Sequence, residues 1–315
     1  MDMTRRQALL NIGKGTASAA AVAGLTTIAL PTAAHASEVS VDPKRAVSML
    51  YDATKCVGCK TCVAACAQAN NLTPDTRLSE GLHQAPADLN AFTKNIIKLY
   101  KPADGGTWSY VKQQCMHCVD PACVGGCSFF ALTKNPENGV VSWNSAKCMG
   151  CRYCEISCPY HVPKFQWEGF NPKIVKCEFC KDRLATGQQP ACTDVCPTHA
   201  VIFGHREDLL REAKKRIQDS PGKYYNDKVF GEHDGGGTQV LYLSHVPFEK
   251  LGLPDSLGPE SIPSKYLRWQ KKLYSYLVVP TVLYASLVGV IRGNWKDHQH
   301  HMDEDQKKTG LRPQL

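Results

Sequence analysis

Apolar residues form two long runs, one near each end of the chain. The first extends from Ala17 to Leu30 and consists mainly of small residues. The second, Leu273 to Ile291, has no charged residue across 19 positions, close to the ~20 that a helix needs to cross a bilayer. The pattern between these runs is much weaker, so we expect the ends of the chain to differ in kind from its middle.

The first run belongs to a predicted export leader. Arg5 and Arg6 precede apolar residues, which is the twin-arginine pattern, and Ala34–Ala36 supplies an A-x-A cleavage site. An ordinary amphipathic helix fits poorly, because the run has no polar face. We expect residues 1–36 to be removed and the mature chain to start at Ser37 in the bacterial periplasm, since the twin-arginine system exports folded proteins.

The second run predicts a membrane anchor helix over residues 266–292. Basic residues flank it on both sides, and Trp295 stands where interfacial aromatics occur. Pro280 removes one helical hydrogen bond and predicts a kink. A buried core helix is the alternative, because the run is barely long enough. With the N-terminal part exported, residues 293–315 become a cytoplasmic tail without regular structure.

The middle of the chain predicts short elements. Strands are expected at Val140–Trp143, at Val201–Phe203 and at Thr238–Leu243. Arg206–Ile217 has apolar residues near helical spacing and predicts one amphipathic helix. Loops dominate elsewhere.

Three polar or glycine-rich segments predict connections. Residues 67–114 are long and polar, and we expect a surface insertion suited to partner contact. Gly235–Gly237 lacks the companion residues of a phosphate-binding loop and predicts a flexible hinge. Pro247–Pro263 is rich in proline and glycine and predicts an extended arm. Residues 205–265 therefore form a connecting region before the anchor.

The net charge of +8 does not indicate nucleic-acid binding. The leader contributes +2, from Arg5, Arg6 and Lys14 against Asp2, which leaves 8 − 2 = +6 on the mature chain. Much of that charge lies beside the second apolar run, where anionic lipid headgroups account for it. Aromatic residues that could stack on bases are not interleaved with the basic ones.

The chemistry of the chain lies in its cysteines. All 16 fall into four groups of four, with spacings C-x2-C-x2-C-x3-C, C-x2-C-x4-C-x3-C, C-x2-C-x2-C-x3-C and C-x2-C-x11-C-x3-C. The groups are Cys56, Cys59, Cys62 and Cys66; Cys115, Cys118, Cys123 and Cys127; Cys148, Cys151, Cys154 and Cys158; Cys177, Cys180, Cys192 and Cys196.

This spacing is typical of iron–sulfur ligands. Three cysteines within seven residues can surround one corner of an iron–sulfur cube, and in two-cluster ferredoxins the fourth cysteine binds the neighbouring cluster. Residues 37–204 therefore predict a domain with four [4Fe–4S] clusters arranged as two pairs. The clusters should supply much of its stability, because the aromatic content is only 8%.

Other uses of cysteine fit less well. Cysteines this close together rarely reach good disulfide geometry. Structural zinc uses two C-x2-C pairs and leaves the third cysteine of each run unexplained. Covalent haem needs C-x-x-C-H, and no histidine follows any of these pairs.

The spacing leaves the pairing of the groups open. The second and third groups are separated by 20 residues and the third and fourth by 18, and either gap suits a compact two-cluster unit. Pro159 and Pro197 directly follow the last cysteine of their groups, as in bacterial ferredoxins, whereas Ala67 and Ser128 stand there in the other two groups. Since proline donates nothing to iron, all 16 cysteines remain predicted ligands.

The order of the four groups resembles the iron–sulfur β subunits of membrane-bound oxidoreductases, such as formate dehydrogenase, nitrate reductase and dimethyl sulfoxide reductase. The stretches SMLYDATKCVGCKTCVAAC and GGGTQVLYLSHVPFEKLGLP are most similar to electron-transfer subunits of hydrogenase-2-type nickel–iron enzymes. The resemblance extends from Ser48 to the apolar run near the C-terminus.

The resemblance implies a nested pairing, the first group with the fourth and the second with the third. Each implied cluster then has its own set of four cysteines. Set one is Cys56, Cys59, Cys62 and Cys196; set two is Cys115, Cys118, Cys123 and Cys158; set three is Cys127, Cys148, Cys151 and Cys154; set four is Cys66, Cys177, Cys180 and Cys192.

The implied fold is α+β: two interlocked bacterial-ferredoxin-like modules with loop insertions, followed by one transmembrane helix. The implied role is an electron relay between the small and large subunits of a periplasmic [NiFe] hydrogenase and a quinone-reactive membrane subunit. No catalytic residue is expected in the chain itself. A molybdenum enzyme such as formate dehydrogenase is the alternative partner. An independent iron–sulfur enzyme fits less well, because every quartet is complete.

Six basic residues stand beside cysteines, where they could stabilise reduced clusters or simply lie on the surface. They are Lys55, Lys60, Lys147, Arg152, Lys176 and Lys181.

Overall fold

The computed structural model describes residues 41–42, 44–73, 86, 88–103, 105–167 and 173–309. The chain divides into two compact units, and in the described range these are a main unit ending at Lys265 and a helical unit beginning at Tyr266. The predicted leader and cleavage site lie outside the described residues. The mixture of helix and sheet agrees with the predicted α+β class.

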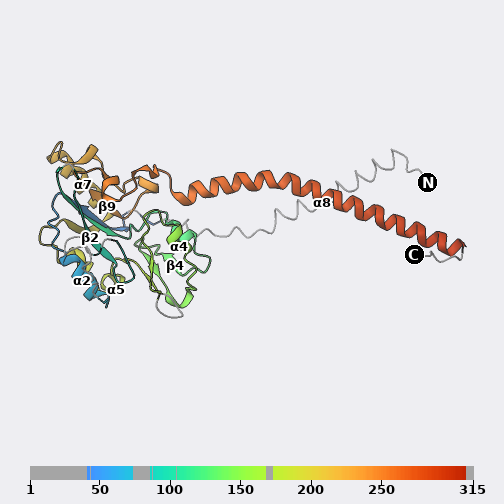
Figure 1. Ribbon diagram of the computed structural model, residues 1–315, viewed down its shortest axis with the longest axis horizontal. Coiled ribbons are helices and arrows are strands. Elements are labelled where there is room, and N and C mark those ends of the chain that lie inside the picture. The colour runs from blue at the N-terminus through green and yellow to red at the C-terminus, as the bar shows by residue number, and fades with distance from the viewer. Residues whose placement is uncertain are drawn as a thin grey trace. The chain divides into compact units, whose positions relative to one another are not determined.

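A three-stranded sheet joins distant parts of the main unit. Its central strand β1 (Val47–Asp52) pairs antiparallel with β8 (Val201–His205) and parallel with β9 (Val240–Leu243). Helix α7 (Arg206–Asp219) packs on one face of this sheet (Figure 1). The predicted strands at 201 and 238 and the predicted amphipathic helix are therefore confirmed.

The two faces of the sheet bury different cores. Leu50 faces α7 and packs in a small core with Leu209 and Ala213. Met49 and Tyr51 face the opposite side and enter the large core that also contains many of the cysteines. This division follows from the alternation of side chains along a strand. The sheet therefore separates the helix from the cysteine-rich half.

A hairpin lies where the sequence predicted a surface insertion. Strands β2 (Asn95–Tyr100) and β3 (Ser109–Gln114) pair antiparallel, and Ile96, Ile97 and Val111 are buried in the large core. The predicted surface insertion was therefore wrong for these two strands. The 48 residues are polar on average, which concealed two six-residue strands within them.

The remaining elements around the cysteines are short. Two small hairpins pair β4 (Leu132–Lys134) with β5 (Val141–Trp143) and β6 (Lys164–Phe165) with β7 (Ile174–Val175), which confirms the strand expected near residue 140. The helices are α2 (Thr61–Ala69), α3 (Ala122–Gly125), α4 (Tyr153–Ile156), α5 (Lys181–Ala185) and α6 (Ala191–Asp194), with a 3₁₀ turn, η2 (Ser145–Lys147).

The segment after β8 is packed rather than extended. The 3₁₀ turns there are η3 (Tyr225–Asp227), η4 (Asp234–Gly236), η5 (Phe248–Leu251) and η6 (Asp255–Leu257). Phe248, Leu251 and Leu253 are buried in the large core, so the predicted extended arm was wrong. Apolar residues between the prolines explain the difference, because the turn η5 directs Phe248 and Leu251 inward.

The glycine triplet is a fixed turn and not a hinge. All three glycines have positive φ, and a Cβ at Gly236 would lie 2.6 Å from the Ser261 side chain. The Arg206 guanidinium donates to the carbonyls of Thr238 at 2.9 Å and Glu232 at 3.0 Å, which fastens the turn to the start of α7.

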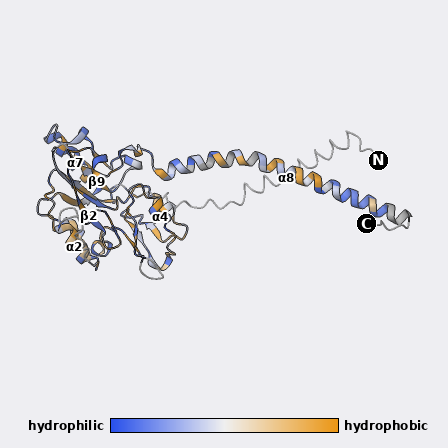
Figure 2. Cartoon of the chain, viewed as in Figure 1, coloured by the Kyte–Doolittle hydropathy of each residue, from blue (hydrophilic) through white to orange (hydrophobic). Residues whose placement is uncertain are grey.

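The helical unit consists of the long helix α8 (Ile262–Thr309), which begins four residues before the unit boundary and contains Pro280. Its middle is mostly apolar and its last part mostly hydrophilic (Figure 2). The helix includes the predicted anchor and continues into the segment for which no regular structure was expected. Over the residues that the structure describes, no helix meets the length and apolarity that a membrane crossing requires.

Candidate iron–sulfur sites

Many of the strongest interactions between thiols join cysteines of one nested set, although Cys62 interacts most with Cys192 of set four. Burial first, and then the charges of Cys127, Cys148 and Cys151, raise the pKa of Cys154 to about 12. Those four residues are set three, drawn from two different cysteine groups. The fold thus brings together thiols that are separated in the sequence.

Set two shows the same arrangement. Burial raises the pKa of Cys118 well above its ordinary value, and the next contributions come from Cys123, Cys158 and Cys115. The fourth cysteine of the third group therefore lies with the first three of the second group.

Sets one and four also draw on two groups each. Burial raises the pKa of Cys56, and Cys196 and Cys59 add to the rise. Burial first, and then the charges of Cys192 and Cys180, raise the pKa of Cys66 to about 11. The last cysteine of each group is therefore placed with the other group of its pair.

Helix packing shows the same pairing. Helix α2, which carries the end of the first group, packs against α6 of the fourth group, and α3 of the second group packs against α4 of the third. In the described residues the first group therefore lies beside the fourth, and the second beside the third.

Tight turns between the cysteines allow this geometry. Gly58 and Gly150 have φ of 71° and 74°, and Lys60 and Arg152 are left-handed immediately before α2 and α4. A Cβ at Gly58 would lie 2.3 Å from the ring of Tyr110, so only glycine fits. Each turn ends the C-x2-C loop and starts the helix that carries the next cysteine.

A second turn follows the last cysteine in three of the groups. Phe130, His161 and His199 are left-handed, and the N–H of each donates to the carbonyl of the cysteine three residues before it. Ser128 thus preserves the turn without proline. The first group differs, because Ala67 lets α2 continue to Ala69.

The sets form a row. Interactions between neighbouring sets give the order one, four, two, three, and the two exposed cysteines, Cys59 and Cys151, belong to the two end sets. The thiols that interact across neighbouring sets are Cys62 with Cys192, Cys177 with Cys115, and Cys123 with Cys154.

The donor chemistry fits iron–sulfur clusters. A cavity beside set three is lined by all four of its cysteines and by apolar side chains such as Leu132, Phe165 and Ile174. In the described ranges, no three His, Cys, Asp or Glu side chains converge closely enough to hold one metal ion. A cluster keeps its cysteines farther apart than a single zinc ion does, because zinc needs every sulfur at ~2.3 Å from one point.

Three buried lysines support the same fit. Lys112, Lys134 and Lys176 are the buried lysines of the described residues, and the structure gives none of them an ion pair with a carboxylate there. A buried ammonium is strongly unfavourable without a negative partner. Thiolate-ligated clusters, which are net anionic, would supply that partner.

Lys112 was not found from the sequence. Burial lowers its pKa, but the surrounding thiols of sets one and four raise it more, so the net pKa is raised and the ammonium stays charged. Its Nζ donates to Gln114, and Tyr242 Oη donates to its carbonyl at 2.6 Å. Lys112 is far in sequence from the cysteines of sets one and four, and the β2–β3 hairpin brings it close to them. The sequence alone therefore did not indicate it.

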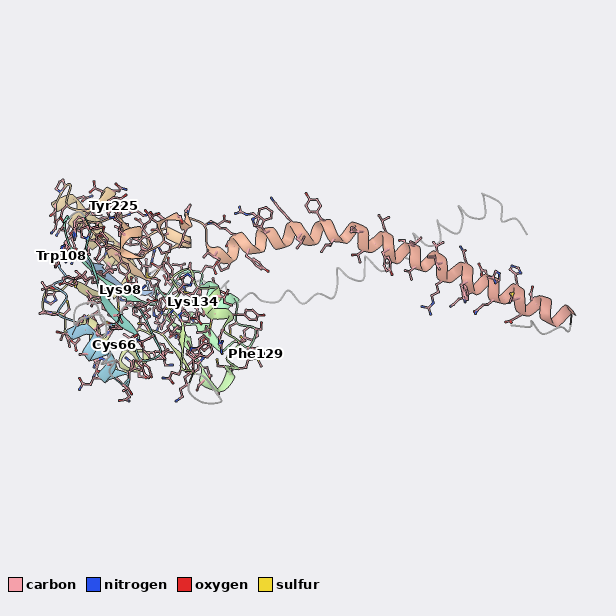
Figure 3. The ribbon with its side chains drawn as sticks, in the orientation of Figure 1. Cys66, Lys98, Trp108, Phe129, Lys134 and Tyr225 are labelled. Carbon is pink, nitrogen blue, oxygen red and sulfur yellow. The ribbon has the colours of Figure 1, made fainter. Side chains whose placement is uncertain are left out.

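The other two lysines act on thiols of set two. Lys134 is labelled in Figure 3, and its Nζ donates to the carbonyl of Cys118 at 2.9 Å. Lys176 Nζ donates to the carbonyls of Val141 at 2.5 Å and Cys177 at 3.1 Å. Of the six basic residues that the sequence placed beside cysteines, Lys176 alone is buried.

His117 separates sets two and four. Its ring stacks on Phe179 with centroids 4.0 Å apart, and Nδ1 accepts from the Val141 N–H at 3.0 Å. Burial first, then Lys176 and Lys134, holds the pKa of His117 well below its ordinary value, so the ring is neutral. Its role here is packing between the two sets.

Comparisons with known proteins agree with these features. Residues 106–206 match the 4Fe–4S dicluster domain. The hydrogenase-2 operon protein HybA of Escherichia coli O157:H7 is 38% identical over 320 residues, covering 91% of this chain and 97% of that protein. The chain belongs to the HybA family. The resemblance inferred from the sequence is thereby confirmed.

HybA-family proteins have more distant relatives among formate dehydrogenases. The nitrate-inducible formate dehydrogenase iron–sulfur subunit of Escherichia coli K12 is 34% identical over 207 residues, covering 65% of this chain and 70% of that protein. The formate dehydrogenase-O iron–sulfur subunit of the same organism is 30% identical over 281 residues, covering 85% and 92%. The chain is an iron–sulfur electron-transfer subunit with multiple [4Fe–4S] clusters, as predicted.

The two ends of the row in this HybA-family chain have different surroundings. Among the described residues, more exposed apolar side chains gather around set three than around set one, where Val57 lies beside Cys56 and Val195 beside Cys196. The exposed side chains around set three are Phe129 (labelled in Figure 3), Phe130, Met149, Tyr153, Ile156 and Trp167.

Proposed function

We propose that this chain relays electrons, one at a time, between a periplasmic [NiFe] hydrogenase and a quinone-reactive membrane subunit. The observation that carries the proposal is the row of four thiol sets, whose two end sets include the exposed Cys59 and Cys151. A row with an exposed end on each side suits a relay, because a partner at either end can exchange electrons with the nearest set.

In this proposal each of the four sets binds one [4Fe–4S] cluster, and a bound cluster takes up and releases a single electron. The chain's own residues hold the clusters and set their potentials through buried charge, hydrogen bonds to sulfur and exclusion of water. Lys112 acts on sets one and four, and Lys134 and Lys176 act around set two.

The choice of hydrogenase rests on similarity along the full chain. The HybA relative is named for a hydrogenase-2 operon, and the alignment covers 97% of it at 38% identity. A molybdenum formate dehydrogenase is the second candidate partner, supported by 30% identity over 92% of the formate dehydrogenase-O subunit. In either complex the chain carries electrons, and catalysis belongs to the hydrogenase large subunit or its molybdenum counterpart.

The proposed location is the periplasmic face of the bacterial inner membrane. The twin-arginine pattern at Arg5 and Arg6 supports export, and the uncharged run Leu273–Ile291 supports attachment. Fractionation of cells that produce the full chain, or a chain that stops after Lys265, tests both. Membrane-bound full chain and released truncated chain are expected; a cytoplasmic full chain contradicts the proposal.

Metal analysis of the complex isolated through this chain tests the partner. Nickel at about one atom per chain is expected, together with about 16 iron atoms per chain for four cubes. Molybdenum in place of nickel overturns the choice of hydrogenase while keeping the relay. Iron well below this number overturns the four-cluster assignment.

A further inference from the structure

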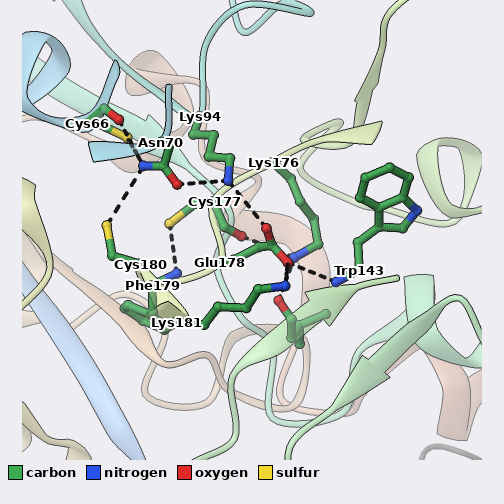
Figure 4. Close-up of polar contacts among 11 residues, drawn as sticks. Cys66, Asn70, Lys94, Trp143, Lys176, Cys177, Glu178, Phe179, Cys180 and Lys181 are labelled. Atoms are coloured by element: carbon green, nitrogen blue, oxygen red, sulfur yellow. Dashed lines mark hydrogen bonds and ion pairs between the residues drawn. The ribbon is translucent and has the colours of Figure 1, made fainter. Parts of the chain in front are cut away.

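One side chain reaches the sulfurs of two cysteines in set four. Asn70 stands at the C-terminal end of α2, and its Nδ2 donates to the Cys66 carbonyl at 2.8 Å. The same nitrogen lies 3.6 Å from Cys66 Sγ and 3.9 Å from Cys180 Sγ (Figure 4). These two cysteines come from the first and fourth groups, so the amide lies where the two groups meet.

A neighbouring lysine fixes which way the amide points. Lys94 Nζ donates to Asn70 Oδ1 at 2.9 Å. An ammonium group can only donate, so the oxygen of the amide must face Lys94 and its NH₂ must face the sulfurs. The orientation therefore follows from chemistry and does not depend on telling amide oxygen from nitrogen.

A carboxylate holds that lysine in place. Glu178 Oε2 lies 3.3 Å from Lys94 Nζ, and both side chains are largely buried. Glu178 Oε1 accepts from the Trp143 N–H at 3.0 Å and from Lys181 Nζ at 3.1 Å. The series Glu178, Lys94, Asn70 thus runs from strand β5 to the sulfurs of set four (Figure 4).

Side-chain hydrogen bonds to sulfur are unevenly distributed among the sets, whereas backbone N–H groups also donate to Cys158 of set two. In the described ranges, the side chains that hydrogen-bond to a cysteine sulfur include Tyr51, Thr61, Asn70 and Thr198, and these act on sets one and four. Asn70 is the one among them that reaches two sulfurs of a single set. Donors to sulfur favour the reduced state of a cluster, which carries the additional negative charge.

We propose that Asn70 raises the reduction potential of the cluster held by set four, and that Lys94 is a positioning residue that keeps the amide donating toward sulfur. The inference rests on the proposed function, because it takes Cys66 and Cys180 as ligands of one cluster. It adds a residue outside the cysteine motifs to the groups that govern electron flow.

A purely structural role makes a different prediction. The Asn70 side chain also donates to the Cys66 carbonyl at the C-terminal end of α2, and loss of one such hydrogen bond costs ~1 kcal/mol of stability. A cap alone would change unfolding but would leave every midpoint potential unchanged. The potential of one cluster is therefore the decisive measurement.

The test is a redox titration followed by electron paramagnetic resonance on the full chain in its complex. Asn70→Leu removes the donor at similar size, and Lys94→Met removes the group that orients the amide while keeping the Asn70 side chain and the backbone cap of α2. Lys98→Met is the matched control. Lys98 lies in β2, the strand that begins at Asn95 directly after Lys94, and among the described residues its side chain has no polar contact. Cys180→Ser identifies the signal of set four.

Asn70→Leu is expected to lower the midpoint of the set-four signal while iron content and the other midpoints stay unchanged. Lys94→Met should lower the same midpoint by more in the wild-type background than in Asn70→Leu. The Lys94 charge acts on Cys66 in both backgrounds, but Lys94 positions the amide only where Asn70 is present. Lys98→Met should change nothing. If Asn70→Leu loses iron, Asn70→Ala, which also removes the donor, takes its place.

Unchanged set-four midpoints in both Asn70→Leu and Lys94→Met, at full iron content, overturn the inference. So does an equal shift of every cluster, which would indicate a general change in the protein. A low iron count in the unmodified chain would instead contradict the proposed ligation, so the two failures are distinguishable.

Discussion

Set four and set three each consist of four cysteines, but the residues that surround the two sets differ. Set four lies in the large core, where Cys177 and Cys192 are buried, Lys112 supplies a positive charge and Asn70 donates to sulfur. Set three has a separate small core with Leu132, Phe165 and Ile174, and the thiol Cys151 is exposed.

The difference separates two properties that the cysteine spacing alone does not distinguish. Four cysteines suffice to specify the kind of cofactor, but the residues around them determine its potential and its access to partners. Set four is surrounded by groups that influence potential. Set three is surrounded by exposed apolar side chains, which suit contact with another protein.

Removing one ligand from each region should produce the largest contrast. Cys192→Ser places a hydroxyl in the large core and disrupts two neighbouring sets, so we expect roughly a tenfold or greater loss of folded protein. Cys151→Ser should remove at most one cluster, about four iron atoms. Iron analysis and yield of the two variants measure the effect. Equal losses would show that the two regions do not differ in stability.

Removing one buried lysine charge should shift the midpoint potentials of only the sets that lie near that lysine. Lys112→Met is expected to lower the midpoints of sets one and four by an amount on the order of tens of millivolts, the size of one partly screened charge. Set three should not respond, because the thiols that Lys112 influences most belong to sets one and four. Lys176→Met should instead lower the midpoint of set two, because Lys176 acts on Cys158 and Cys123. A shift of set three in Lys112→Met contradicts the separation.

Charged substitutions on the surface should affect electron exchange without affecting the clusters. Ile156 is 76% exposed beside set three, and Val57 is 59% exposed beside set one. Ile156→Glu and Val57→Glu should each change stability by less than ~0.5 kcal/mol, as surface substitutions usually do. Each should slow exchange with a different partner, measured as hydrogen-dependent reduction of the clusters and as their reoxidation by quinone. If both variants slow the same step, the two ends do not serve separate partners.

The smallest effect is expected far from both sets. Lys228 pairs with Asp234 at 2.7 Å and also contacts Asp255. Lys228→Met should lower the free energy of unfolding by about 0.5–1 kcal/mol, since the pairs are partly exposed. Every midpoint should remain unchanged. A change in any midpoint would mean that loss of stability alone alters potentials, which would weaken the comparison.

The pH dependence of this contribution has a definite sign. Burial lowers the pKa of Lys228, but hydrogen bonds and charge from Asp234 and Asp255 raise it more, so the folded pKa is raised. The stabilisation is therefore complete below the unfolded lysine pKa of ~10.4 and is lost as the pH rises through the folded value. Chemical denaturation of the wild-type chain and Lys228→Met should converge above that pH.

Local patterns predicted the elements whose own apolar spacing is clear in the sequence, even where their partners are distant. Helix α7 and strands β5, β8 and β9 were expected from apolar spacing, and the structure contains them. The β2–β3 hairpin was missed, because its burial depends on β9 through contacts such as Tyr242 with Lys112. The turns after Pro247 were read as extended for the same reason: the core that buries Phe248 is assembled from distant segments.

The sequence by itself determined the cofactor chemistry of this protein, because four cysteine quartets at ferredoxin spacing have few other uses. It also determined the family, through the residues around those cysteines. Only the tertiary structure decided the order of the sets and the position of Lys112, Asn70 and Lys94 around them. Those features depend on contacts between residues far apart in the chain, and such contacts exist only after the sheet and hairpins have brought the four groups together.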